Sequence, residues 1–267
     1  MKKILLSALV LTLGFGVANA QEEETPSRFN LSGTFETSHL WRGLEVSEKP
    51  TLSTLISYDL TKDKALQVGV WGGMAVSNEH DDASGVAKHY KEIDYFIQYS
   101  KGGATIGVWD LYNMTSNDGN IFDYDKDNCY HLIDLRTSYQ FKEDFPLRLE
   151  ADVLLYGLGD QNADKDQRYS TYVEASYPFV RGKKVDFKGF IGAGFAFNPG
   201  EGENSLGVLT DKTHLYGDGK NSFDIVNIGF TATKKVKIFD TYIPISATTL
   251  WNPSLELARV QLAVNLF

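Results

Sequence analysis

The sequence predicts an all-β protein, an antiparallel up-and-down transmembrane β-barrel of twelve strands. Three observations lead to this fold class. Apolar and polar residues alternate at a spacing of two along most of the chain, which is typical of strands with two different environments on their faces. Every second connection between these segments is short, and the others are mostly longer and polar. After residue 20 the stretches without charge are too short for a spanning helix, so a membrane-embedded chain must close its sheet.

The N-terminal segment has the features of an export signal. Lys2 and Lys3 precede an apolar run that ends at Phe15, and small residues follow at 18–20. The run is shorter than the roughly 20 residues of a spanning helix, and a buried helix of a cytosolic protein is the less favoured alternative. We therefore expect a signal peptide at 1–20 with cleavage after Ala20, a barrel at 21–267, and a location in the outer membrane.

Twelve segments show the alternation that predicts strands. One face of each segment except 104–113 is apolar, and we assign that face to lipid and the other to an enclosed interior. Ile191 and Val226 are expected on the lipid side and Ser138 on the inner side. The segment 104–113 has polar and apolar residues on both faces, so its sequence does not predict which face is turned to lipid. The segments are 29–41, 51–60, 66–76, 92–99, 104–113, 133–141, 147–155, 169–179, 185–197, 226–232, 243–251 and 260–266.

The connections differ in charge as well as in length. The five short turns (61–64, 101–103, 142–146, 180–184 and 234–240) hold ten basic and four acidic residues. The five longer loops (43–49, 77–88, 115–128, 158–168 and 198–221) hold seven basic and sixteen acidic residues, and the last connection, 252–254, is short. Short turns at one end and long loops at the other are typical of outer-membrane barrels. We therefore expect an acidic outer rim.

The chain as a whole is acidic and contains a single cysteine. Its formal net charge of −9 argues against a nucleic-acid surface, and the single Cys129 forms neither an internal disulfide nor a cysteine-built metal site.

In a closed barrel the first and last strands must pair. The terminal aromatic Phe267 resembles the assembly signal of outer-membrane barrels, which implies the assembly machinery as a partner, although it shares parity with the polar Asn265.

Residues 37–50 read TSHLWRGLEVSEKP and resemble the first hairpin of the TorF-type porin family, with His39 and Ser38 standing where that family more often has tyrosine and aspartate. The resemblance extends to Asn252-Pro253 and to residues on two middle segments, and it implies an outer-membrane barrel with a pore but no particular substrate. The matching positions are Trp41, Arg42, Gly43, Ser47, Pro50, Glu92, Asp94, Tyr99, Gly107 and Val108. For Arg42-Gly43 we favour a rim device, in which glycine permits a turn and arginine reaches the headgroup layer, over a ligand-binding role.

The inner faces collect more acids than bases. A water-filled lumen with this balance would favour cations. The alternative is that the charges pair across the interior and close it, helped by the bulky inward residues Trp71, Phe96, Tyr156, Tyr172 and Phe190. The candidate lumen-lining residues are Glu36, Glu92, Asp94, Asp134, Arg136, Arg148, Glu150, Asp152, Glu174, Lys188 and Arg259.

Asp123, Asp125 and Asp127, with Asp134 further on, have carboxylates at the spacing of a calcium loop. Asn128 stands where such a loop has glycine, so a solvated acidic loop is the preferred interpretation. The acidic loops as a group are expected to share divalent ions with lipopolysaccharide phosphates.

The sequence favours a narrow or gated channel for small solutes with a cation-leaning lumen. Two alternatives remain: a non-conducting surface structural or adhesive barrel, and a soluble exported β-sandwich. An enzyme is not expected, because a lipase-type site needs a serine and a histidine on one face. Ser38 and His39 are adjacent and would point to opposite faces, and the other four histidines have no serine two residues away. No cofactor is expected.

Overall fold

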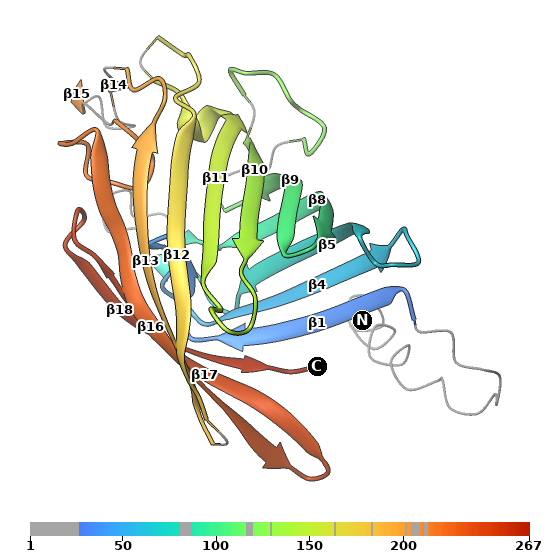
Figure 1. Ribbon diagram of the computed structural model, residues 1–267. Coiled ribbons are helices and arrows are strands. Elements are labelled where there is room, and N and C mark those ends of the chain that lie inside the picture. The colour runs from blue at the N-terminus through green and yellow to red at the C-terminus, as the bar shows by residue number, and fades with distance from the viewer. Residues whose placement is uncertain are drawn as a thin grey trace.

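Twelve strands of the chain form one closed antiparallel barrel in the computed structural model (Figure 1), which confirms the predicted fold class and strand number. The expected signal peptide at 1–20 and Cys129 lie outside the described residues. The structure describes residues 27–80, 87–115, 120–128, 130–162, 164–182, 184–200, 202–203, 209–210 and 213–267. Among these residues no helix is both long enough and apolar enough to cross a membrane.

The barrel strands follow the alternating segments of the sequence closely, and the segment without a predicted phase forms a strand with the expected bounds. They are β1 (Phe29–Glu36), β4 (Thr51–Asp59), β5 (Leu66–Ala75), β8 (Lys91–Lys101), β9 (Ala104–Asn113), β10 (His131–Gln140), β11 (Arg148–Tyr156), β12 (Ser170–Arg181), β13 (Asp186–Ala196), β16 (Phe223–Ile238), β17 (Thr241–Asn252) and β18 (Leu257–Asn265).

In the described parts of the long connections there are three small hairpins and one short helix. The hairpins are β2 (His39–Trp41) with β3 (Leu44–Ser47), β6 (Glu79–His80) with β7 (Ala87–Lys88), and β14 (Gly202–Glu203) with β15 (Leu209–Thr210). The 3-10 helix η1 (Leu158–Asp160) follows β11. The strands pair with their sequence neighbours around the barrel, and the sheet closes where β1 pairs with β18.

The two faces of the sheet differ as the alternation predicts. On β4 the apolar Leu52 and Ile56 are exposed, whereas Ser53 and Ser57, which follow them in the sequence, are buried. The same contrast recurs around the barrel and leaves large apolar side chains exposed on most strands. A closed sheet with an outer apolar surface satisfies every backbone hydrogen bond internally and presents hydrocarbon to its surroundings, as a membrane barrel requires.

Two β-bulges change the expected phase of strand ends. On β16 the register shifts opposite Gly192 and Ala193, so that Val226 is an extra residue between two paired neighbours. Val226 is 0% exposed and packs in the interior, so its assignment to the lipid side is wrong. On β11 a similar shift makes Tyr156 the partner of Ile133, which is on the outer face, so the inward assignment of Tyr156 is also wrong.

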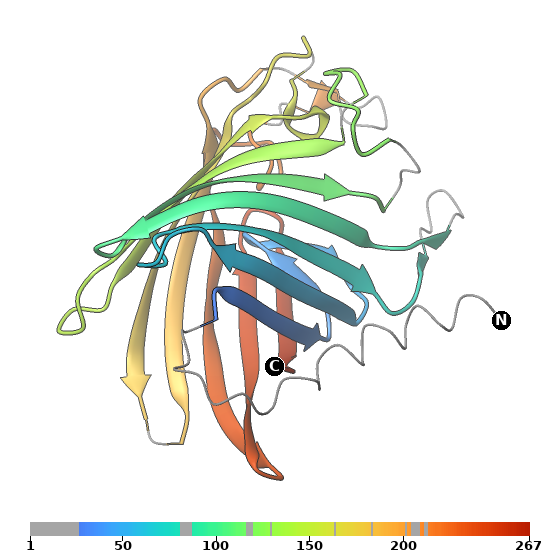
Figure 2. The same cartoon turned by 90° about the vertical axis from the view of Figure 1, so that its right-hand side faces the viewer.

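The connections alternate in length as expected, but one turn is shorter. β16 continues to Ile238 and β17 begins at Thr241. The expected turn at 234–240 is therefore a two-residue connection, and its three lysines belong to β16. Figure 2 shows β16 and β17 extending past the neighbouring strands at this end of the barrel. The long loops gather at the opposite end.

Candidate functional site

The hairpin of β2 and β3 turns at Arg42 and Gly43. Both residues have positive φ, 49° and 86°, which is the conformation of a two-residue type I′ turn. A side-chain carbon on Gly43 would lie 1.9 Å from the carbonyl oxygen of Val226, so only glycine fits against the wall at this point. The first long connection therefore folds into the barrel and packs against β16.

Arg42 attaches this hairpin to the opposite part of the wall. Its Nη2 donates to a carboxylate oxygen of Asp134 and to one of Asp152, each at 2.7 Å. Its Nη1 donates to the hydroxyl of Tyr216 at 3.1 Å. Arg42 is 9% exposed and both aspartates are fully buried. The expectation that Arg42 reaches the headgroup layer is therefore wrong, because its guanidinium is held inside the barrel by two carboxylates.

A second loop segment completes this contact. Tyr216 is fully buried and packs with Tyr172 of β12 and Val226 of β16. The amide of Asn252 donates to the backbone oxygens of Gly43 and Tyr216, at 3.1 and 3.2 Å. We call Arg42, Asp134, Asp152 and Tyr216 the lumen lock. The lock joins the first loop, the fifth long loop and the strands β10 and β11.

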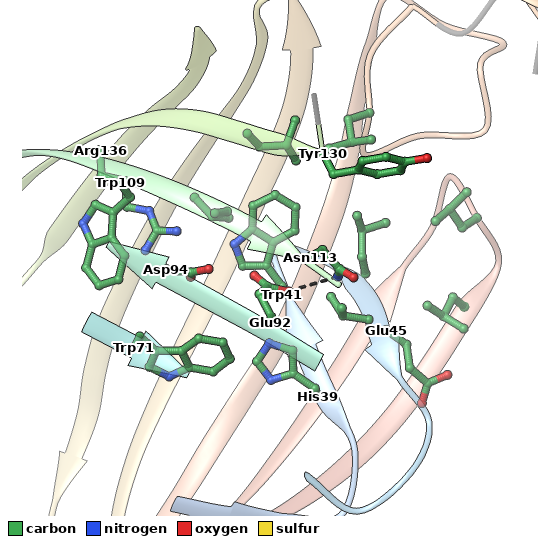
Figure 3. Close-up of a pocket in the computed structure, with 17 residues that line it drawn as sticks. His39, Trp41, Glu45, Trp71, Glu92, Asp94, Trp109, Asn113, Tyr130 and Arg136 are labelled. Carbon is green, nitrogen blue, oxygen red and sulfur yellow. Dashed lines mark hydrogen bonds between the residues drawn. The ribbon is translucent and has the colours of Figure 1, made fainter. Parts of the chain in front are cut away.

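A cavity of about 610 Å³ remains inside the barrel beside the hairpin (Figure 3). The hairpin forms one side, and the strands β5, β8, β9, β10 and the beginning of β18 form the rest together with loop residues. Its surface is mostly aromatic and aliphatic, with a few charged groups. The residues that line it are His39, Trp41, Leu44, Glu45, Val46, Trp71, Glu92, Asp94, Trp109, Leu111, Asn113, Tyr130, Leu132, Arg136, Leu215, Leu255 and Leu257.

Glu92 and Asp94 occupy successive inward positions of β8 in this cavity. Glu92 accepts hydrogen bonds from the hydroxyl of Tyr90 and the amide of Asn113, both at 3.1 Å. Asp94 is 4% exposed, and its Oδ1 has no hydrogen-bond partner among the described residues. The cavity therefore contains a buried carboxyl group with one oxygen that the described residues leave without a hydrogen bond.

Arg136 is the cavity's arginine, and its charge is already engaged. Its Nε donates to Asp134 at 2.6 Å, and its guanidinium lies over the ring of Trp109 at 4.1 Å from the centroid. Trp109 in turn stacks on Phe96, with ring centroids 4.2 Å apart. The arginine thus connects the cavity wall to the lumen lock through the shared Asp134.

Two further groups of the expected lumen residues form local pairs on β11 and β12. Arg148 forms an ion pair with Glu150 two residues away on the same face. Glu174 accepts from the hydroxyl of Tyr172 at 2.5 Å and from the amide of Asn227 at 3.2 Å. These charges are neutralised or hydrogen-bonded locally along one part of the wall, whereas the closing alternative expects pairs across the interior, of which Arg42 with Asp134 and Asp152 is an example.

The remaining expected lumen residues lie near the hairpin or further along the wall. Glu36 binds His39 at 2.6 Å, and Arg259 binds Glu45 of the hairpin at 2.5 Å. Lys188 is exposed on β13. The structure therefore brings Asp134, Asp152 and Arg136 together around Arg42, places Glu92 and Asp94 in the cavity, and leaves Lys188 outside both groups.

The three loop aspartates do not converge. Asp123 and Asp125 each accept the backbone N–H of the residue two positions on, at 3.0 and 2.9 Å. Asp127 forms an ion pair with Lys165 at 2.8 Å. Asp134, the fourth carboxylate of the calcium-loop spacing, binds Arg42 instead. Within the described residues no group of three or more potential ligands is placed to hold a metal ion.

Sequence reasoning missed Tyr216 and Asn252 as partners of the hairpin. Tyr216 lies 174 positions from Arg42 in the sequence, in a loop without strand alternation. Asn252 was noticed only as part of the Asn-Pro pair before the last strand. Trp109 was not assigned to the interior because both faces of its strand are mixed. In the structure the outer polar residue of that strand, Asp110, binds His131 at 2.6 Å, under the loop that contains Ile121 and Tyr124.

No known protein family matches the chain, and no curated protein matches it. Among solved structures, an outer membrane channel from Pseudomonas putida F1 is similar, with 14% sequence identity and a TM-score of 0.46, over 93% of this chain and 98% of that one. A triple mutant of the Rhodopseudomonas blastica porin is similar with 10% identity and a TM-score of 0.34, over 89% of this chain and 99% of the porin. The fold assignment rests on the strand pairings described above.

Proposed function

We propose that the chain is an outer-membrane barrel that passes small solutes through a lumen narrowed by the β2–β3 hairpin. The observation that carries this proposal is the hairpin itself, held inside the barrel by the lumen lock while a cavity of about 610 Å³ stays open beside it. A twelve-stranded barrel is intermediate in width between barrels filled by side chains and wide porins. An inserted loop therefore decides how much of its lumen is open.

The charge of the interior supports a preference for cations. Several of the inner acids are paired with arginines, but Glu92 and Asp94 face the cavity without an ion pair of 4 Å or less among the described residues. Fixed carboxylates along a narrow path attract cations and repel anions. We therefore propose a cation-leaning lumen.

The experiment is conductance of the purified full chain in planar bilayers. The wild type is expected to give small steps, with a reversal potential in a KCl gradient that shows cation preference. The Arg42→Gln variant, which releases the hairpin, is expected to give larger steps. Arg181→Gln at the end of β12 is the matched control, because Arg181 is exposed and outside the lock. Absence of conductance in both the wild type and Arg42→Gln would reject a channel.

A non-conducting surface barrel is the second candidate, and the buried lumen lock favours it. Separating the ion pairs of the lock would leave buried charges without partners, and this cost opposes movement of the hairpin out of the lumen. Conductance that appears only in Arg42→Gln would support this candidate. The exported β-sandwich is excluded, because the strands form a single closed sheet.

Location and partners belong to the same proposal. The outer apolar surface and the segregation of long loops to one end support an outer-membrane location after removal of a signal peptide at 1–20. We further propose contact of the acidic loops with lipopolysaccharide through shared divalent ions, and recognition of Phe267 by the outer-membrane assembly machinery.

A further inference from the structure

The Asp94 carboxyl group in the cavity has no evident role in stabilising the fold. Its side chain lies between its register partners Trp71 of β5 and Leu111 of β9. It is 4% exposed, and its Oδ1 has no hydrogen-bond partner within the part of the chain that the structure describes. A buried polar atom without a partner costs free energy, and such atoms need a reason beyond folding. Figure 3 shows this carboxylate among the side chains that face the cavity.

The other charges of the cavity leave a negative excess. Glu45, Glu92 and Asp94 line it together with one arginine, Arg136. Glu45 is paired with Arg259, outside the cavity lining. The guanidinium of Arg136 is directed to Asp134 and covered by Trp109. Arg136 still attracts Asp94 electrostatically, and Asp94 and Glu92 interact with each other. Neither carboxyl has an ion pair within 4 Å among the described residues, so the excess negative charge of this pair remains to receive a cationic ligand.

The rest of the wall is suited to an apolar body. Tryptophan and leucine side chains supply most of the surface, namely Trp41, Trp71, Trp109, Leu44, Leu111, Leu132, Leu215, Leu255 and Leu257. Arg136 already lies over Trp109, so the aromatic wall accepts a cation of the chain itself. A volume of about 610 Å³ is within the usual range for small-molecule sites. A hydrated inorganic cation would leave this apolar surface unused.

We propose that the cavity binds an organic ammonium ion with an apolar body, whose charge faces Asp94 and Glu92 and whose body lies against the tryptophans and leucines. This inference deepens the proposed function, since it rests on a lumen that solutes enter and names their chemical class. Binding is an equilibrium property of the cavity and needs no conductance. It is therefore measured separately from the bilayer experiment.

The test is titration of the full barrel in non-ionic detergent micelles with benzylammonium at neutral pH, where its three N–H groups can donate to the carboxylates, followed by calorimetry and tryptophan fluorescence. Three of the four tryptophans line the cavity, so the fluorescence reports mainly on this site. Benzyl alcohol and benzoate are the neutral and anionic comparisons with the same ring. The ammonium ion is expected to bind at least about tenfold more tightly than either, because only it pairs with the carboxylates. Equal binding of the three compounds would overturn the proposal.

The Asp94→Asn variant separates charge from shape. It is expected to weaken ammonium binding by about tenfold or more, while Asp94→Glu retains it. Asp59→Asn is the matched control, because Asp59 is 2% exposed on the inner face of β4 but lies outside the cavity lining. Unchanged affinity in Asp94→Asn would refute the site. If that variant does not fold, as judged by heat-dependent gel mobility, the three-compound series on the wild type decides alone. Tight ammonium binding without conductance would leave this site standing and reject the channel.

Discussion

At the residue scale, Gly43 is required by two separate constraints that single substitutions can distinguish. It has positive φ, and its Cα faces the Val226 carbonyl so closely that an added carbon would overlap it. Gly43→Ala is expected to lower the free energy of unfolding by about 1 to 3 kcal/mol through backbone strain and overlap together. Urea unfolding in lipid vesicles measures this. The control is Gly102→Ala, where φ is also positive but no atom lies within 4 Å of the added carbon. Equal losses at the two sites would show that the contact with Val226 has no effect.

Asp160, in the loop after β11, links stability to pH. Its carboxyl is fully buried, Oδ2 accepts from Ser170 and Gln167, and Oδ1 has no partner among the described residues. Burial raises the pKa of Asp160 above its ordinary value of 3.8, despite opposing hydrogen bonds. The folded state therefore holds its proton to higher pH than the unfolded state, and the stability from this group is lost as pH rises from 3.8 through the folded pKa.

The Asp160→Asn variant is expected to remove this pH dependence. The free energy of unfolding of the wild type minus that of the variant should fall as pH rises between 3.8 and the raised folded-state pKa, and become constant above it. Urea titrations in detergent at several pH values measure the difference. A difference that stays constant, or that rises with pH, would contradict the assigned direction.

The residues of the lumen lock show how far single positions can be predicted. The Arg-Gly step is visible in the sequence because the two residues are adjacent and glycine marks a turn. Asp134 and Asp152 could be placed on inner faces by alternation alone. Their meeting with Arg42 could not be predicted, because the loop folds inward through contacts with Tyr216, Val226 and Asn252 that no local pattern encodes.

At the element scale, alternation predicts which face of a strand is outside as long as the ladder is regular. Ile191 on β13 is 49% exposed, on the outer face as expected, whereas Val226 on the paired strand β16 is buried inside. The difference is the bulge opposite Gly192 and Ala193. One extra residue reverses the parity of everything before it on that strand. The position of a bulge depends on packing between strands, so the alternation of apolar and polar residues does not predict it.

An arginine scan tests the faces of regular strands. Ile191→Arg is expected to lower the free energy of unfolding in lipid vesicles by about 2 to 4 kcal/mol, because it places a charge in hydrocarbon. Ser138→Arg on the inner face of β10 should cost much less, since it enters a polar environment that contains Glu150. Urea unfolding of both variants measures the losses. Similar losses at both positions would mean that the inner face is as dry as the outer one.

At the scale of the whole molecule, the barrel could be predicted because its requirements are repetitive. Alternation, even strand number and segregated loop lengths all follow from one sheet that crosses a membrane and closes. The contents of the lumen could not be predicted, because two long loops enter it and their inner contacts are unique to this chain. Figure 3 shows the result, a cavity between a loop hairpin and the strands of the barrel wall.

The pairing of β1 with β18, which closes the barrel, contains fewer residue pairs than any other pairing of barrel strands. β1 and β18 share three register pairs, Thr34 to Glu36 against Ala263 to Asn265, whereas β1 and β4 share eight. Phe267 extends this seam. Its carbonyl accepts from the amide of Gly33, and its ring occupies the space of a Gly33 side chain, with Cζ 2.7 Å from where a Cβ would lie. The ring therefore turns toward β1, although its position in the sequence shares parity with inward residues.

Phe267→Ala is expected to destabilise the pairing of β1 with β18, whereas removal of an exposed phenyl ring elsewhere should have little effect on it. Removing the ring uncovers Gly33 and loosens the last residues of the closing strand, and an unpaired margin within hydrocarbon costs several kcal/mol for each free amide or carbonyl. Folding into lipid vesicles, followed by heat-dependent gel mobility, should give a smaller folded fraction. Phe239→Ala in the β16–β17 turn is the control, since Phe239 is 94% exposed. Because the vesicles contain no assembly machinery, the assay reports on the closure of the sheet alone, and equal yields from the two variants would show that Phe267 has no role in that closure.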